Sequence, residues 1–374
     1  MGESAACNVL LTSDRRPRKC RFENYPRQKS ATEVQLFDKR FVVVTGKGGV
    51  GKSTVVAALA LCAARAGKRV LCCEVNAKER IAPLLGARLT GSVIQEAVCG
   101  IYTVNVMPRD AMREYALMKL RFEAVYKTVF ENRLVSHFLR MVPSLAETVM
   151  LGKTWYEVEA KTNGRYKWDM VLLDAPATGH GISLLRVPRT LLDTVPPGPM
   201  RDDAEKMQAT ISDPTKTRVD LVTLPEEMPV NETLELEEAL REDLQLPLGF
   251  IHLNGFVEKR FSDEERRMLR AVAEPESPAG ETPLEPRPGT SASPGRPVHL
   301  LEPAVAAARA GLYQASRAER SANYERKLRE ASNRRPILRL PLLHSASWGR
   351  EQVEMLASFM AGEQSCPRGA GGVP

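Results

Sequence analysis

The sequence lacks any apolar run of the roughly 18 residues that would span a bilayer. Its basic N-terminal stretch, residues 15–21, has no long apolar segment after it, so it does not have the pattern of a secretory signal. We therefore expect a cytoplasmic protein. Aromatic residues make up only 6% of the chain and are few within its basic clusters. Stacking of bases on such clusters is not indicated, and the sequence carries no strong nucleic-acid signal.

Cysteines at the spacing of a metal or redox motif are also missing. The chain has seven cysteines, with no C-x-x-C among them. Cys62, Cys72 and Cys73 lie in apolar segments and are interpreted as small core residues. The spacing does not predict a disulfide framework, and we expect no structural zinc site.

The formal net charge is +7 and the isoelectric point is near 9.0, which is modest for 374 residues. Basic residues cluster before Lys29 and between Arg317 and Arg335. A solvated surface is the favoured interpretation of both clusters. Peripheral membrane contact through either cluster stays open as an alternative.

Most of the chain is expected to form one α/β domain over residues 39–362. Residues 1–38 are predicted to be a flexible basic arm, 274–298 a disordered Pro-rich loop and 363–374 a disordered tail. Strands are expected near 41–45, 69–74, 101–106, 169–174, 218–224, 248–254 and 336–340. Helices are expected at 53–66, 232–244, 263–273, 304–332 and 352–360, with a helical insertion at about 110–162. This alternation predicts a doubly wound, mainly parallel sheet.

A phosphate-binding loop follows the first strand. The pattern G-x-x-x-x-G-K-[ST] is met between a β-branched run and an Ala/Leu-rich helix, which is the context that the motif needs. Its glycines let backbone N–H groups and the helix N-terminus converge on phosphate, and its final Lys and Ser reach the β/γ oxygens and Mg²⁺. The predicted MgATP-binding residues are Gly46, Lys47, Gly48, Gly49, Val50, Gly51, Lys52, Ser53 and Thr54.

Lys47 makes this loop the deviant form of the Walker A motif. In that class a lysine directly after the first glycine reaches across a dimer interface to the partner's nucleotide. A surface lysine without a role is the alternative. Lys47 and Lys52 are therefore both candidate catalytic residues of a dimer.

Asp174 ends an apolar strand, where a Walker B or switch carboxylate belongs. With Ser53 it is predicted to hold Mg²⁺, directly or through water. Pro176, Thr178 and His180 follow in a polar segment that could respond to the γ-phosphate. The alternatives are a helix N-cap for Asp174 and a loop histidine without function for His180.

Longer stretches resemble the ArsA family, which includes the arsenite-pump ATPase and the ATPase that targets tail-anchored membrane proteins. The matching pieces are GKGGVGKST at 46–54, DAPATGH at 174–180, DPTKTRVDLVTLPEEMPVNET at 213–233, LNG at 253–255 and LPLL at 340–343. They cover most of residues 41–360 and look like the compact bacterial branch of the family. The resemblance implies a nucleotide-sandwich dimer, a switch II at residues 174–181 and contact between Asn254 and adenine.

Three departures from the family pattern bear on activity. Asn76 occupies the position of the switch I aspartate that positions water, and an amide cannot act as a carboxylate base. Glu74 and Glu79 lie nearby and could substitute for the aspartate. No C-x-x-C lies between Asn254 and Pro336, where the targeting ATPase has its zinc clasp. The segment after switch II, residues 186–212, is short for a large client-binding lid.

The sequence is therefore consistent with two functions. The first is a slow, dimeric MgATP-hydrolysing switch that acts on a protein client. The second is a hydrolysis-deficient ATP-binding subunit that pairs with an active paralogue. Whether the dimer is homo- or heteromeric stays open.

Overall fold

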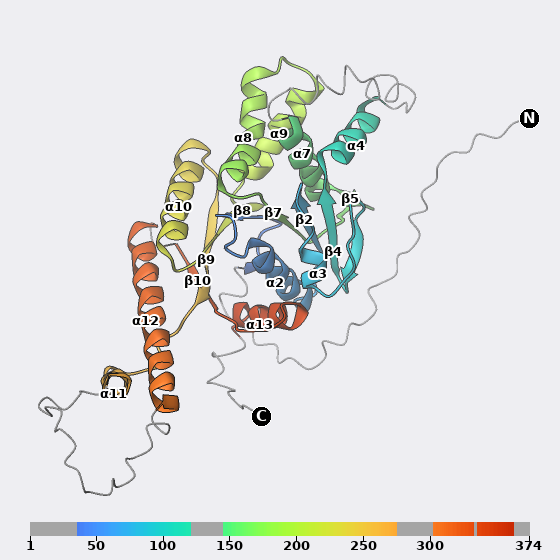
Figure 1. Cartoon of the computed structure of the whole chain (residues 1–374). Coiled ribbons are helices and arrows are strands. Elements are labelled where there is room, and N and C mark those ends of the chain that lie inside the picture. Colours follow the sequence, from blue (N-terminus) through green and yellow to red (C-terminus); the bar gives the residue numbers. More distant parts are fainter. Residues whose placement is uncertain (1–35, 121–144, 275–301, 333–334, 363–374) are drawn as a thin grey trace, which may run out of the picture.

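The computed structural model describes residues 36–120, 145–274, 302–332 and 335–362, and the facts below concern those residues. They form one large sheet with helices on both faces (Figure 1). Leu36 and Phe37 are already buried, so the folded body includes the end of the predicted arm. The rest of that arm, nearly all of the 274–298 loop and the C-terminal tail fall outside the described residues. None of the described helices is long and apolar enough to cross a membrane.

The central sheet has eight strands in the order β10-β9-β8-β1-β7-β2-β4-β3. All neighbouring pairs are parallel except β3 with β4. Strands covered on both faces must be apolar on both faces, which explains runs such as FVVVTG and VLCCEV. The strands of this sheet are β1 (Phe41–Gly46), β2 (Val70–Val75), β3 (Gln95–Val98), β4 (Ile101–Val106), β7 (Met170–Asp174), β8 (Thr217–Thr223), β9 (Leu248–Phe256) and β10 (Ile337–Pro341).

Helices cover the two faces as separate layers. On one face α2 packs with α13 and α3, and the other face carries most of the remaining helices. The helices are α2 (Lys52–Arg65), α3 (Ile81–Leu84), α4 (Pro108–Leu120), α7 (Leu145–Glu159), α8 (Thr178–Thr194), α9 (Pro199–Ser212), α10 (Glu227–Glu238) with a π-helical turn η1 (Ala239–Asp243), α11 (Asp263–Ala273), α12 (Glu302–Ala331) and α13 (Arg350–Met360).

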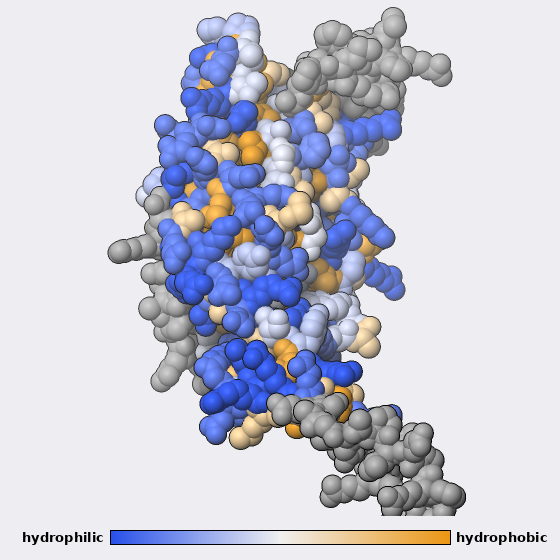
Figure 2. All heavy atoms as spheres, turned by 60° about the vertical axis from the view of Figure 1, so that its left-hand side comes forward, coloured by the Kyte–Doolittle hydropathy of each residue, from blue (hydrophilic) through white to orange (hydrophobic). Residues whose placement is uncertain are grey.

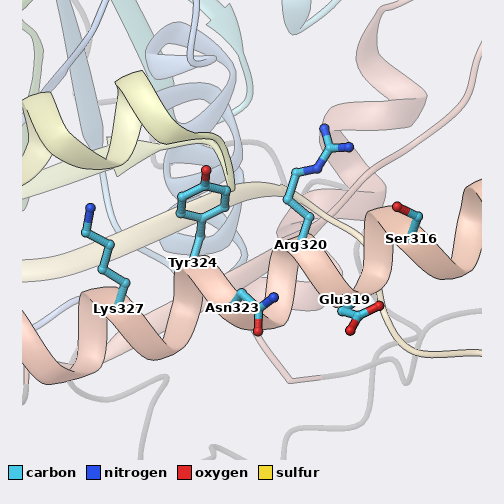
Figure 3. A pocket seen from close by; sticks show the side chains of 6 residues that line it. All are labelled: Ser316, Glu319, Arg320, Asn323, Tyr324 and Lys327. Atoms are coloured by element: carbon cyan, nitrogen blue, oxygen red, sulfur yellow. The ribbon is translucent and has the colours of Figure 1, made fainter.

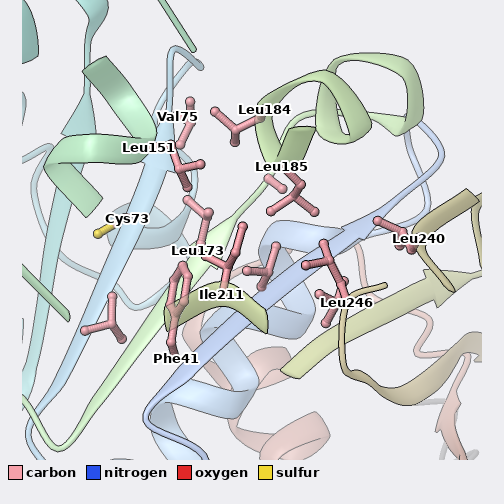
Figure 4. Close-up of a cluster of buried hydrophobic side chains, with 14 of the residues drawn as sticks. Phe41, Cys73, Val75, Leu151, Leu173, Leu184, Leu185, Ile211, Leu240 and Leu246 are labelled. Carbon is pink, nitrogen blue, oxygen red and sulfur yellow. The ribbon is translucent and has the colours of Figure 1, made fainter. Parts of the chain in front are cut away.

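The layer that contains α7 to α10 encloses one of two apolar clusters. Phe41 and Leu173 from the sheet meet Leu184 and Ile211 from α8 and α9 there, and all four are fully or almost fully buried (Figure 4). Because this cluster spans the sheet and the helices that follow Asp174, it fixes the carboxyl edge of the strands relative to those helices.

The structure contains elements that the sequence did not predict. The polar segment after Asp174 is only partly a loop, because α8 begins at Thr178 and continues through Pro188, and α9 follows it. Within the predicted insertion, α4 and α7 are separate helices, and residues 121–144 lie outside the described residues. Cys99 is disulfide-bonded, although the spacing did not indicate it. The short hairpin of β5 (Lys161–Thr162) and β6 (Arg165–Tyr166) was also not anticipated.

Candidate nucleotide-binding site

The loop between β1 and α2 lies at the carboxyl edge of the parallel sheet, where ligands bind in open α/β folds. Gly46 and Gly51 have φ of 149° and 94°, values that side chains rarely allow. A Cβ on Gly46 would lie 2.3 Å from the carbonyl oxygen of Val222, and one on Gly51 would lie 2.4 Å from Nδ2 of Asn254. Both glycines are therefore required by the close approach of neighbouring strands to the loop.

Lys52 lies over its own loop. Its Nζ donates to the carbonyl oxygens of Gly46 at 3.1 Å and Lys47 at 2.9 Å. Burial lowers the pKa of this ammonium, with Asp174 opposing the shift. The cation is thus held where the sequence predicts that it meets the β/γ phosphates.

Ser53 and Asp174 come together as the sequence predicts for a magnesium site. The Ser53 hydroxyl donates to Oδ2 of Asp174 at 2.6 Å, and Oδ1 of Asp174 is buried without a hydrogen-bond partner among the described residues. Burial raises the pKa of Asp174 to about 6, and the hydrogen bond from Ser53 and the charge of Lys52 oppose the shift. A divalent cation would supply the partner that the orphaned oxygen lacks, so these two side chains fit Mg²⁺.

Asn254 is positioned by β9 directly against the loop. Its Nδ2 donates to the carbonyl oxygen of Val50 at 2.9 Å. This tie across 204 residues of sequence holds the glycine turn in place. The predicted contact between Asn254 and adenine stays a prediction.

Lys47 is paired within its own chain. Its Nζ donates to a carboxylate oxygen of Glu232 on α10, and both side chains are partly exposed. Sequence reasoning placed Glu232 in a family-like stretch but gave it no role, since 185 residues separate it from Lys47. The only available signal was the opposite charge of a residue within that stretch.

Comparison with known proteins agrees with this geometry. Residues 39–196 match the family described as Anion-transporting ATPase. The chain is 30% identical over 226 residues to ATPase BagA of Mycobacterium tuberculosis, covering 59% of this chain and 66% of that protein. It is 26% identical to the arsenical pump-driving ATPase of Acidiphilium multivorum, over 58% of this chain and 39% of that protein. It is 25% identical to ATPase ASNA1 homolog 1 of Paramecium tetraurelia, over 44% and 48% of the two chains.

The chain belongs to the ArsA family. It spans just under two thirds of the mycobacterial relative and less than half of the other two.

The switch I segment of this ArsA-family chain follows β2. Asn76 has a positive φ of 44° and an exposed side chain, while its backbone N–H donates to Val106. Glu79 uses both carboxylate oxygens to accept the N–H groups of Thr90 and Gly91, at 2.7 and 2.9 Å. Glu79 is therefore committed to the loop before β3, and the idea that it replaces the aspartate loses support.

Glu74 is placed differently. It lies at the end of β2 in register with Asp174 of β7 and is almost fully buried. Its Oε1 accepts the backbone N–H groups of Arg80 at 2.6 Å and Ile81 at 3.3 Å. Burial raises its pKa to about 7, and the two hydrogen bonds oppose that shift.

The segment predicted to be switch II, residues 174–181, packs tightly on the strand that carries the loop. A Cβ on Gly181 would lie 2.8 Å from Oγ1 of Thr45 and 2.9 Å from the carbonyl oxygen of Pro176. The Thr45 hydroxyl is buried and without a hydrogen-bond partner in the described part of the chain. His180 is exposed on the first turn of α8.

A second concave region lies away from the phosphate loop. A groove of about 490 Å³ runs along one side of α12 (Figure 3) and is lined by Ser316, Glu319, Arg320, Asn323, Tyr324 and Lys327. Lys327 donates to Oδ1 of Asn231 on α10 at 2.6 Å, which ties the groove to the helix that holds Glu232. The groove contains charges of both signs, and none of the predicted nucleotide ligands lines it.

Proposed function

We propose that this chain binds MgATP at the loop and hydrolyses it slowly as a dimeric switch. The observation that carries the proposal is the Ser53–Asp174 contact beneath the loop, with one oxygen of Asp174 buried and unpaired. A glycine turn without a ligand would not explain a buried carboxylate that lacks a partner. Membership of a family of ATPases supports the same conclusion.

The proposed reaction is in-line transfer of the γ-phosphoryl group to water. The water oxygen forms a bond to Pγ, and the bond from Pγ to the β,γ-bridging oxygen breaks with its electron pair left on ADP. The proton of the water passes to the phosphate product. Lys52 and the loop N–H groups neutralise charge on the β/γ oxygens, and the side chain of Asn76 orients the water. Magnesium, when held by Ser53 and Asp174, supplies Lewis-acid neutralisation of the same oxygens.

The proposed switch uses Lys47. In the free chain this lysine is paired with Glu232. In the dimer it would leave Glu232 and reach the partner's nucleotide, so that closure exchanges one charge pair for another. ATP binding and hydrolysis would then alternate the two states and act on a protein client.

Calorimetry and phosphate release test this function together. We expect MgATP binding and a measurable steady-state rate for the wild-type chain, and loss of both for Lys52→Ala, because the main cation on the β/γ oxygens is removed. A wild-type rate indistinguishable from that of Lys52→Ala would show that the chain does not hydrolyse ATP.

The second candidate is an ATP-binding subunit that relies on an active paralogue. The observation that favours it is the amide at position 76, which is exposed and cannot accept a proton as a carboxylate does. Asn76→Asp distinguishes the two. A rise in hydrolysis of tenfold or more would mark Asn76 as the cause of a weak activity, whereas an unchanged rate, alone and with a candidate partner chain, would remove that explanation.

A further inference from the structure

The loop between β2 and α3 is shaped by Glu74. Its carboxylate accepts the backbone N–H of Arg80 at 2.6 Å and so closes the loop of residues 76–80. Glu74 is itself in register with Asp174, on the neighbouring strand about 4.8 Å away. Two hydrogen bonds and one strand pairing therefore connect Ser53, through Asp174 and Glu74, to the backbone of Arg80.

The guanidinium of Arg80 has no structural task of its own. Arg80 is exposed, and among the described residues its side chain forms neither a hydrogen bond nor an ion pair. Its charge lowers the pKa of Lys52 and also that of Asp174, where it is a minor opposing influence. Those two groups flank the predicted positions of the β/γ phosphates and Mg²⁺, so the charge of Arg80 acts on the same part of the molecule.

A cation near this place has a clear chemical use. Phosphoryl transfer spreads negative charge over the γ-phosphoryl oxygens, and an arginine supplied in cis or in trans stabilises that charge. Arginine suits the task because its planar group donates two parallel hydrogen bonds to phosphate oxygens. Lys47 is paired with Glu232 in this chain, and Lys52 is folded onto its own loop, whereas Arg80 is a cation whose side chain has no hydrogen bond or ion pair among the described residues.

We propose that Arg80 is a further catalytic residue that contacts the γ-phosphate of ATP from the switch I loop, and that Glu74 is the residue that positions it. This inference rests on the proposed function, since it concerns the same nucleotide site. It also gives Glu74 a role different from that of a substitute base. The carboxylate holds the loop through a backbone N–H, and the cation of that loop meets the substrate.

Comparison of ADP with a non-hydrolysable ATP analogue tests Arg80 directly. We expect Arg80→Ala to weaken the magnesium complex of the analogue by roughly tenfold or more, and to leave ADP affinity within about twofold, because only the analogue carries a γ-phosphate. Hydrolysis is expected to fall on the order of 100-fold or more.

Lys78→Ala is the matched control. Lys78 is an exposed cation of the same loop, its side chain has no hydrogen bond or ion pair within the described residues, and its removal changes the net charge equally. We expect it to alter neither ligand. If both variants weaken the analogue equally, the effect is general electrostatic attraction and the proposal is wrong. It is also wrong if Arg80→Ala binds analogue and ADP as the wild type does.

A double-mutant cycle tests Glu74. Glu74→Ala removes the acceptor of the Arg80 N–H, and we expect it to reduce the preference for the analogue over ADP. In an Arg80→Ala background the same change should leave that preference unaltered. A purely structural role for Glu74 would instead lower the affinity for both nucleotides in both backgrounds.

Failure of the proposed function would look different. If the wild-type chain binds neither nucleotide, or binds as Lys52→Ala does, the site is not a nucleotide site. If the wild type binds and Lys52→Ala does not, while Arg80→Ala matches the wild type with both ligands, only the inference about Arg80 falls.

Discussion

Two buried carboxylates at matching positions of neighbouring strands give the site an unusual charge balance. Glu74 and Asp174 are in register, and each has a pKa raised mainly by burial, to about 7 and about 6. Asp174 also contributes to the shift of Glu74. Metal-free protein near neutral pH therefore keeps a proton that isolated carboxyl groups would have released.

This arrangement predicts a pH-dependent stability. Between about pH 4.5 and pH 7 the native chain binds more protons at Glu74 than the unfolded chain, so the free energy of unfolding falls as the pH rises through this window. The shift from 4.5 to about 7 corresponds to on the order of 3 kcal/mol. Urea unfolding of metal-free protein at pH 5 and pH 8 measures it.

Glu74→Gln is the control for that experiment. The amide oxygen can still accept the N–H of Arg80, but the side chain no longer titrates. We expect a clearly smaller loss of stability between pH 5 and pH 8 in this variant. An unchanged pH dependence would mean that Glu74 does not hold the proton.

Sequence reasoning was most successful where the signal is local. The stretch from Gly46 to Ser53 joins a strand to a helix, as its pattern predicts, and Asp174 was recognisable because it ends an apolar strand. The Lys47–Glu232 pair could not be found in this way. Its partners are far apart, and nothing in one chain's sequence records which charges meet.

Among the elements, α8 packs closely on the strand that carries the phosphate loop. Gly181 approaches Thr45 and Pro176 so closely that a methyl group would have to displace one of them. Because Thr45 directly precedes the loop, we expect movement of the start of α8 to be passed to the predicted nucleotide site through this contact. That is the expected behaviour of a switch segment.

Gly181→Ala should destabilise the chain by about 1–3 kcal/mol, the range for overpacking a filled site. Gly179→Ala is the matched control, since it lies in the first turn of the same helix and has no atom within 4 Å of an added Cβ. We expect no loss of stability there. Denaturant unfolding measures the stability of both variants. Equal effects would show that the close contact with Thr45 does not make Gly181 necessary for stability.

The sequence predicted an element well where its apolar pattern is compatible with only one buried secondary structure. Strands of the parallel sheet lie within two residues of their expected positions because apolar β-branched runs suit little else. α8 and α9 were not predicted, and their sequence contains prolines that disfavour helix interiors, at Pro188 and in the Pro-rich turn near residue 197. Packing of Leu184, Leu185 and Ile211 into the core overrides that local signal.

On the scale of the whole molecule, side-chain hydrogen bonds through α10 connect the phosphate loop to the long helix α12. Lys47 bonds Glu232 on α10, and the adjacent Asn231 accepts from Lys327 of α12. Figure 2, which brings the α10 and α12 side of Figure 1 forward, shows a largely hydrophilic surface with small scattered apolar areas. Such a surface suits an interface that opens and closes better than a permanent one.

Release of Lys47 should favour closure. Glu232→Gln removes the charge that holds Lys47, and we expect the ATP-analogue concentration needed for half-maximal dimerisation to fall severalfold. Glu227→Gln, which removes an exposed carboxylate from the same helix, should have no effect. Analytical ultracentrifugation over a nucleotide titration measures this. Identical curves for the two variants would show that the Lys47–Glu232 pair does not control dimerisation.

The central claim is that ATP, and not ADP, closes two copies around the nucleotide site. Light scattering of purified chain with Mg²⁺ and a non-hydrolysable ATP analogue, set against Mg²⁺ and ADP, tests it most directly. The account predicts twice the monomer mass with the analogue, less dimer with ADP, and no gain of mass for Lys47→Ala with either. A mass that is the same with both nucleotides would contradict the account.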